Sequence, residues 1–150
     1  MEVIEKIDKK VITDASKKSI LIVDDSDFIR ERLVALCDEI ENIGLVLEAK
    51  NSDQAYSQFT LLSPEIVILD IHIPGDNGIK VLENLRKISK EVKIIILTNY
   101  PYDQYRKKCI ELGADYFFDK SGDMNRILEI CEKIMLTNNN RMTARPNDNK

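Results

Sequence analysis

Long apolar runs, paired cysteines and blocks of positive charge are all missing from this sequence of 150 residues. No stretch approaches the roughly 18 consecutive apolar residues that cross a bilayer, so no membrane span is expected. The first ten residues, MEVIEKIDKK, mix both charges and lack the apolar core of a secretory signal. The three cysteines form no C-x-x-C pair, which fits a reducing, cytoplasmic setting and predicts plain core packing for Cys37, Cys109 and Cys131.

The charge balance excludes another class of function. The net charge is −4 and Lys and Arg form no block of useful length, so direct nucleic-acid binding by this chain is not expected. A hydrophobic content of 43% and a charged content of 32% are typical of a globular protein. The length suffices for one domain with a sizeable core.

What the sequence does contain is an alternation of short apolar runs and helical periodicity. Each run is bounded by turn or charged residues, as buried strands are, and the connections are too long for hairpins. We therefore expect an α/β fold in which a doubly wound, five-stranded parallel sheet is flanked by five helices. The predicted strands are residues 20–23, 45–47, 66–69, 94–97 and 116–118.

Local signals predict where the helices begin and end. Ser26 is the predicted N-cap of the first helix, with Gly44 as its stop. The second helix is predicted to begin at Ser52 and to end before Pro64. The fourth is predicted to begin near Pro101.

Both ends of the chain lie outside this alternation. Residues 1–18 carry a weak apolar stripe, which predicts a short helix or no structure. Residues 137–150, TNNNRMTARPNDNK, contain almost no large apolar side chain and are predicted to be a disordered polar tail, too short to fold into a DNA-binding unit. The folded domain is therefore predicted to span residues 19–136.

Polar and charged side chains gather where the predicted strands end. Asp24 and Asp25 follow the first strand, Asp70 follows the third, Thr98 the fourth, and Lys120 stands close behind the fifth. In open α/β sheets the ligand binds outside the carboxyl ends of the strands. We therefore expect these five side chains to form one site.

Three carboxylates in one site need a compensating charge. Two carboxylates about 5 Å apart repel by roughly 3 kcal/mol at an effective dielectric constant of 20. One lysine cannot offset every such pair, so either some acids are protonated or a divalent cation completes the site. Oxygen ligands with water nearby favour Mg²⁺.

Such a site suits phosphoryl transfer to Asp70. A carboxylate can act as a nucleophile and form an aspartyl phosphate, and Mg²⁺ neutralises charge that develops on the transferred group. The Thr98 hydroxyl and the Lys120 ammonium would each hold one non-bridging oxygen.

Four segments resemble the response-regulator receiver domain of two-component signal transduction, over about residues 19–136. They are ILIVDDS, IVILDIHIPGDNGI, IIILTN and GADYFFDKS. The resemblance implies a flavodoxin-like sheet with strand order 2-1-3-4-5. It also implies a phosphoprotein that takes a phosphoryl group onto Asp70 from a histidine kinase or a phosphotransfer protein. Such a protein catalyses only its own phosphorylation and dephosphorylation, so it is not expected to be an enzyme in the usual sense.

The same resemblance implies a set of Mg²⁺ ligands. Asp25 and Asp70 match the residues that contact the ion directly, and Asp24 matches the one that acts through water. His72 matches the position whose backbone carbonyl supplies another ligand. These roles rest on the resemblance and not on the spacing.

Signalling is implied to involve a second group of residues. Thr98 matches the switch hydroxyl and Lys120 the phosphate-binding lysine. Phe117 stands where the family has an aromatic that rotates inward as Thr98 moves. The face around the fourth helix, the fifth strand and the fifth helix would change on phosphorylation and bind an unidentified downstream protein, and a homodimer of the phosphorylated form is compatible with the family.

Three positions depart from the family's pattern. Ser121 replaces the usual proline after Lys120. A cis bond before a non-proline costs about 2.5–4 kcal/mol, so the Lys120–Ser121 peptide bond could be trans in this chain. Asn99 stands where a small residue is usual, and its bulk is expected to slow hydrolysis. Phe117 has no hydroxyl, so an inward switch would be a packing event only.

Plainer interpretations stay open beside these roles. Asp24 and Asp25 could cap the first helix, Thr98 could be a turn residue, Lys120 a solvated side chain and Phe117 a permanently packed core aromatic.

Two other functions are also open. One is a receiver-like interaction module that works without phosphorylation, although such modules typically lose part of the acid cluster. The other is a Mg²⁺-dependent phosphatase with an aspartate nucleophile, which needs a second acid two residues after the nucleophile. This chain has His72 there, for which we expect a place at the edge of the pocket.

Overall fold

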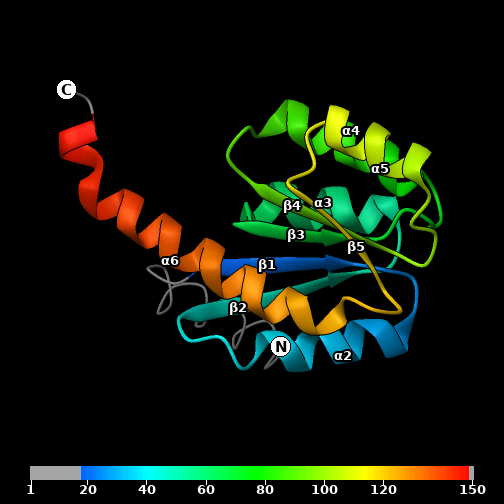
Figure 1. Ribbon diagram of the computed structural model, residues 1–150, viewed down its shortest axis with the longest axis horizontal. Helices are drawn as coiled ribbons and strands as arrows, with labels where there is room; N and C mark the ends of the chain where they lie inside the picture. Colours follow the sequence, from blue (N-terminus) through cyan, green and yellow to red (C-terminus); the bar gives the residue numbers. More distant parts are fainter. Residues whose placement is uncertain (1–17, 149–150) are drawn as a thin grey trace.

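The computed structural model describes residues 18–148 and, among them, the side chains of residues 18–137. One sheet of five parallel strands has the order β2-β1-β3-β4-β5, which confirms the predicted fold (Figure 1). The predicted extension of residues 1–18 lies outside the described residues, apart from Lys18 at the start of β1. The strands are β1 (Lys18–Val23), β2 (Ile43–Ala49), β3 (Ile66–Leu69), β4 (Lys93–Thr98) and β5 (Tyr116–Asp119).

Helices cover both faces of the sheet, as a doubly wound fold requires (Figure 1). Two of them, α2 (Asp27–Cys37) and α6 (Met124–Asp148), pack against each other on one face. The other face carries α3 (Ser52–Leu62), α4 (Gly78–Ile88) and α5 (Asp103–Glu111). Each helix connects two parallel strands or follows the last one.

The central strands are buried on both sides because each lies between the two helical layers. In β1, Ile20 and Ile22 pack in the core beneath α2 and α6. Leu21 and Val23 pack in the core beneath α3, α4 and α5. Successive side chains of a strand point to opposite faces, so a continuous apolar run is what two separate cores demand.

The first helix begins as predicted. The Ser26 hydroxyl accepts a hydrogen bond from the Ile29 amide at 3.2 Å, which satisfies a backbone donor of the first turn. The predicted stop at Gly44 is wrong, because α2 ends at Cys37 and Gly44 lies inside β2. The chain reverses instead at Asn42, whose φ of 70° is a conformation that Asn tolerates better than most residues.

The backbone at the C-terminal end also differs from its prediction. Residues 137–148 continue α6 as a helix, where the composition predicted a disordered tail from residue 137. Adding a residue to an existing helix fixes one residue for one new hydrogen bond, which is far easier than starting a helix. Among residues 18–148, no helix is both long and apolar enough to span a bilayer.

Candidate functional site

The ends of four neighbouring strands bring the predicted site residues to one edge of the sheet. Backbone hydrogen bonds continue the strand pairing to these residues: the Asp70 amide donates to the Val23 carbonyl at 2.9 Å, and the Lys120 amide donates to the Thr98 carbonyl at 2.9 Å. Their side chains therefore start from backbone positions that the sheet fixes.

Lys120 lies between two buried carboxylates. Its ammonium nitrogen is 2.6 Å from Asp24 Oδ2 and 3.1 Å from Asp70 Oδ2. The side chains of Lys120, Asp24 and Asp70 are only 6%, 3% and 7% exposed. The interpretation of Lys120 as a solvated surface residue is therefore wrong.

Asp25 completes a group of three acids. One carboxylate oxygen each from Asp24, Asp25 and Asp70 lies within 4.8 Å of the others. Asp25 is exposed, whereas Asp24 and Asp70 are buried, so the group opens to solvent on the side of Asp25.

The pKa values of Asp70 and Lys120 reflect this crowding. Burial raises the pKa of Asp70, and the charge of Asp24 adds to the effect, against the lowering influence of Lys120. Burial disfavours the charged form of Lys120, but the hydrogen bond to Asp24 and the charges of Asp70 and Asp24 outweigh it, so the pKa of Lys120 is raised. The site stabilises positive charge and resists a further negative one.

The donor set fits a divalent cation. Three carboxylates against one ammonium leave an excess of two negative charges when all groups are ionised, and the available ligand atoms are all oxygens. Mg²⁺ prefers such oxygen ligands and usually retains waters, which the exposed side at Asp25 can admit. Close to this group, the His72 amide lies 3.4 Å from Asp70 Oδ1, so the peptide before His72 approaches the carboxylate.

Thr98 is fully buried at the end of β4. Its hydroxyl accepts a hydrogen bond from the Tyr100 amide at 3.0 Å, so in this conformation the side chain shapes the turn after the strand. This contact is the one that the turn-residue interpretation expects, and it does not prevent the hydroxyl from donating elsewhere.

Phe117 is buried in the core beneath α3, α4 and α5. The Arg106 guanidinium lies 4.6 Å from the centroid of the Phe117 ring, and Arg106 also donates to the Phe117 carbonyl at 3.3 Å. The aromatic therefore already points inward.

The turn after Asp70 depends on a glycine. A Cβ atom added to Gly78 would lie 2.1 Å from the Asp70 carbonyl oxygen, and the Gly78 amide donates to the Ile71 carbonyl at 2.6 Å. The start of α4 thus packs directly against the backbone of the predicted phosphate acceptor. The loop at Lys120–Ser121 is trans, as is each peptide bond among the residues that the structure describes.

An aromatic cluster near the site was not recognised from the sequence. The exposed His72 ring lies edge-on to Tyr100 at 4.5 Å and to Tyr105 at 6.1 Å. Tyr102 lies 5.7 Å from Tyr105 and is 56% exposed. The tyrosines at positions 100, 102 and 105 were the signal in the sequence that could have revealed this cluster.

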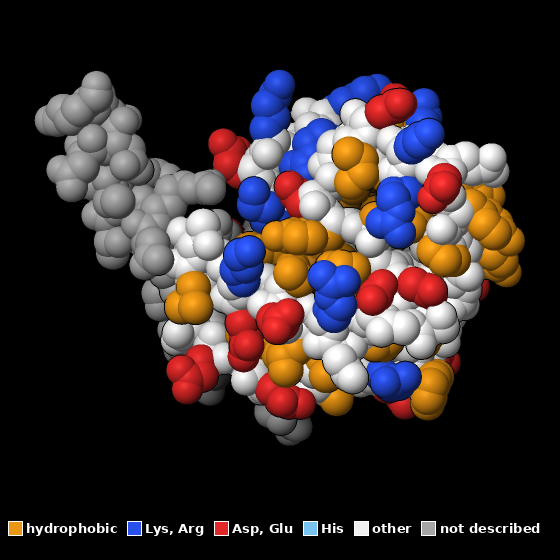
Figure 2. Space-filling view, in the orientation of Figure 1, with side chains coloured by type: hydrophobic (Ala, Val, Ile, Leu, Met, Phe, Trp, Pro, Cys, Tyr) orange, Lys and Arg blue, Asp and Glu red, His pale blue; other side chains and the backbone are white. Residues whose placement is uncertain are grey.

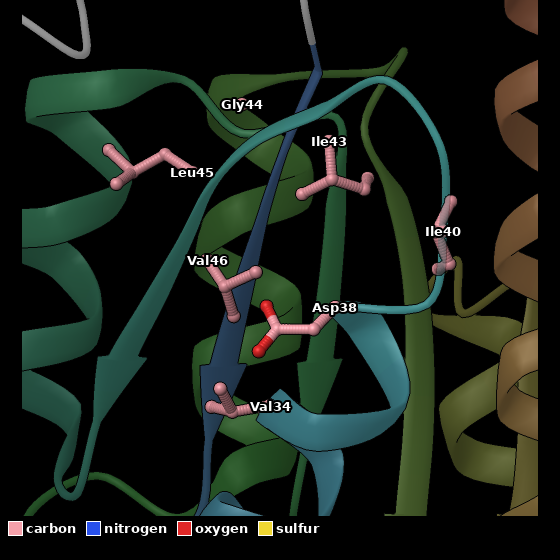
Figure 3. A pocket seen from close by; sticks show the side chains of 7 residues that line it. All are labelled: Val34, Asp38, Ile40, Ile43, Gly44, Leu45 and Val46. Atoms are coloured by element: carbon pink, nitrogen blue, oxygen red, sulfur yellow. The ribbon is translucent and has the colours of Figure 1, made fainter.

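The hollow drawn in Figure 3 lies elsewhere. It is formed where α2 ends and β2 begins, with Val34, Asp38 and Val46 among its lining residues. This is away from the carboxyl ends of the strands, and it does not include any of the predicted site residues.

Comparison with known proteins agrees with this geometry. The family model described as "Response regulator receiver domain" matches residues 20–132. Protein CcdB of Bacillus subtilis (strain 168) is 31% identical over 116 residues, which cover 77% of this chain and 96% of CcdB. The sensory transduction protein LytT of Oceanobacillus iheyensis is 29% identical and matches 89% of this chain, but the chain spans only 54% of LytT, and several other relatives are likewise spanned for about half of their length.

Solved structures resemble the chain as well. A CheY-like response regulator receiver domain protein from Methanospirillum hungatei JF-1 has 26% identity and a TM-score of 0.72, covering 79% of this chain and 94% of that one. A two-component response regulator of the LuxR family from Aurantimonas sp. SI85-9A1 has 27% identity and a TM-score of 0.73, covering 81% and 86%.

Proposed function

The chain belongs to the response regulator receiver domain family, and we propose that it accepts a phosphoryl group on Asp70. The donor would be a histidine kinase or a phosphotransfer protein. The observation that carries this proposal is the position of the Lys120 ammonium between the buried carboxylates of Asp24 and Asp70.

In the proposed reaction an oxygen of Asp70 attacks the phosphorus of a phosphohistidine. A P–O bond forms as the P–N bond breaks, and the imidazole nitrogen leaves with the electron pair and takes up a proton from solvent. Lys120, now bound to Asp70 Oδ2, donates to a phosphoryl oxygen as the negative charge moves outward from the carboxylate. Water removes the modification by attacking the phosphorus: the P–O bond to Asp70 breaks, the carboxylate is restored and inorganic phosphate leaves. The chemistry is then confined to the chain's own phosphorylation and dephosphorylation.

The remaining residues have supporting roles. Asp24, Asp25, Asp70 and the His72 carbonyl would hold Mg²⁺, which neutralises charge on the phosphoryl oxygens when it is bound. Thr98 would exchange its contact with the Tyr100 amide for one in which its hydroxyl donates to the phosphoryl group.

The face formed by α5, β5 and α6 is the proposed output surface. Phe117 and Phe118 of β5 are held between cations of the two helices, with Arg106 over Phe117 and Arg126 at 4.9 Å from the Phe118 centroid. Figure 2 shows hydrophobic, basic and acidic side chains next to one another where β5 and α6 face the viewer, a composition suited to a protein partner. Movement of Thr98 at the end of β4 would reach this face through the paired strand β5. The partner could be a separate target protein or a second phosphorylated copy.

The test is incubation of the chain with acetyl phosphate and Mg²⁺, followed by intact-mass measurement. We expect a gain of one phosphoryl group in the parent and none in Asp70→Asn. The matched control is Asp76→Asn, an exposed acid in the same loop, which should be labelled like the parent. Equal labelling of Asp70→Asn would mean that another residue is the acceptor, and no labelling of the parent would favour an interaction module that works without phosphorylation. Steady release of phosphate from unrelated phosphomonoesters would favour a phosphatase.

A further inference from the structure

Arg30 of α2 holds the backbone of the acid pair although it takes no part in the proposed chemistry. Its guanidinium donates to the Asp24 carbonyl at 2.6 Å and to Glu48 Oε1 at 3.0 Å, and it also binds the Asp27 carboxylate. One planar group therefore connects the end of β1, the start of α2 and the edge strand β2.

The burial of Arg30 indicates which of these contacts matters. Its side chain is 12% exposed, whereas the side chains of Asp27 and Glu48 are 81% and 47% exposed. Ion pairs with exposed acids contribute about 0–1 kcal/mol and do not by themselves explain why the Arg30 side chain is largely covered. The contact that takes the group inward is the one with the Asp24 carbonyl.

That carbonyl belongs to the peptide unit between Asp24 and Asp25. Because a peptide unit is planar and rigid, fixing its oxygen also fixes the direction in which the chain leaves for Asp25. The other groups of Asp24 are already held: its amide donates to the Ala49 carbonyl at 3.0 Å, Oδ1 accepts from the Ser26 amide at 2.9 Å, and Oδ2 binds Lys120. Arg30 supplies the contact that orients the next residue.

We propose that Arg30 is a positioning residue that sets the orientation of the Asp24–Asp25 peptide and thereby the affinity of the acid group for Mg²⁺. This inference rests on the proposed function. Two carboxylates already compensate the charge of Arg30, so its effect is one of geometry and not of counter-charge. Lysine cannot replace it, because an ammonium is a point donor and does not reach three acceptors in one plane.

The experiment uses the full chain with Arg30→Lys, Arg30→Gln and Glu48→Gln. The controls are Arg32→Lys and Arg32→Gln, which change an exposed arginine of the same helix in the same way. Amide NMR spectra recorded during a Mg²⁺ titration give the dissociation constant. In the metal-free protein, the Ser26 amide donates to Asp24 Oδ1, so its hydrogen exchange rate reports on how firmly the segment from Asp24 to Ser26 is held.

We expect both Arg30 variants to bind Mg²⁺ about 10-fold more weakly than the parent, as is typical when a group that supports a metal ligand is lost. Glu48→Gln keeps Arg30 but weakens one of its ion pairs, so it should show a smaller loss of Mg²⁺ affinity. The Arg32 variants should bind Mg²⁺ like the parent. Ser26 should exchange faster in Arg30→Lys. Parental affinity in Arg30→Lys would overturn the inference, even if Arg30→Gln were weaker, because charge alone would then suffice.

Failure of the proposed function has a different signature. If the parent itself does not bind Mg²⁺, the receiver chemistry proposed above fails. Positioning of the loop by Arg30 is then decided by the metal-free exchange of Ser26: faster exchange in Arg30→Lys supports it, and an unchanged rate rejects it.

Discussion

Lys120 and Arg86 are cations at opposite ends of the same sheet, and they differ in how many charged partners they bind. At the carboxyl ends of the strands, Lys120 contacts the carboxylates of Asp24 and Asp70. At the amino ends, Arg86 of α4 donates to four backbone carbonyls and to Asp115 Oδ2, at distances of 2.7–3.2 Å. The carbonyls are those of Ser89, Lys90, Val92 and Gly113.

The difference separates a structural cation from one at the proposed phosphorylation site, and we refer to that end of the sheet as the functional end. Four of the five acceptors of Arg86 are neutral carbonyl oxygens and the fifth is the carboxylate of Asp115, so these acceptors gain a donor without repulsion between like charges. The partners of Lys120 repel each other, and with Asp25 nearby they retain unbalanced negative charge. One end of the sheet is therefore electrostatically complete, while the other is stabilised by any additional positive charge.

The largest effect is expected when the structural cation is removed. Arg86→Met leaves several partly buried carbonyls without a donor, so we expect a loss of about 3 kcal/mol in the free energy of unfolding. Urea denaturation measures this, and Mg²⁺ affinity of the folded protein should not change. Lys87→Met, which removes an exposed cation from the same helix, is the control and should have little effect. If the free energy of unfolding of Arg86→Met fell only as little as that of the control, Arg86 would not be the structural cation described above.

A glycine at the functional end should also be sensitive. In Gly78→Ala the new methyl group meets the Asp70 carbonyl at 2.1 Å, so the acceptor loop must move. Although alanine favours helices more than glycine does, overpacking should dominate and lower the free energy of unfolding by about 2 kcal/mol. Phosphorylation from acetyl phosphate should slow as well. Gly122→Ala, which meets no atom within 4 Å, is the matched control, and equal stability of the two variants would contradict the clash.

Removal of a charge at the functional end should stabilise the protein. Asp70 is buried with a raised pKa, so its ionisation disfavours the folded state at neutral pH. Asp70→Asn should therefore raise the free energy of unfolding by about 1 kcal/mol at pH 7 without Mg²⁺.

The difference in stability between the parent and Asp70→Asn should depend on pH. Below its unfolded pKa the carboxyl is protonated in both states, and the relative stability of the parent falls as pH rises through the raised folded pKa. The advantage of Asp70→Asn should therefore shrink in acid, and saturating Mg²⁺ should stabilise the parent more than the variant. Thermal melting at several pH values measures both, and a lower melting temperature for Asp70→Asn at pH 7 would contradict the interpretation of the site as overcharged.

The functional end was predictable from the sequence because its chemistry resides in side chains at strand ends. Apolar runs located the strands, parallel pairing placed their carboxyl ends together, and Asp24, Asp70 and Lys120 followed from that. The contacts of Arg30 and Arg86 with backbone carbonyls were not predictable by this reasoning, since every residue carries a carbonyl and the sequence does not mark which one is used. The end of α2 was misplaced because the prediction used Gly44 as its stop, whereas α2 ends at Cys37 and the left-handed residue of the following connection is Asn42.

The smallest effect is expected for a third cation, which is exposed and interacts with a ring. Arg106→Met removes the guanidinium that lies 4.6 Å from the Phe117 centroid, and an exposed contact of this kind contributes about 0.5 kcal/mol. Urea denaturation should resolve this loss against Lys107→Met, an exposed cation of the same helix. The NMR signals of the Phe117 ring should shift in Arg106→Met and not in the control. Because Arg106 shares no acceptor with Lys120, the Mg²⁺ affinity of Arg106→Met should stay at the parental value. A changed affinity would mean that β5 already couples the proposed output surface to the acid group before phosphorylation.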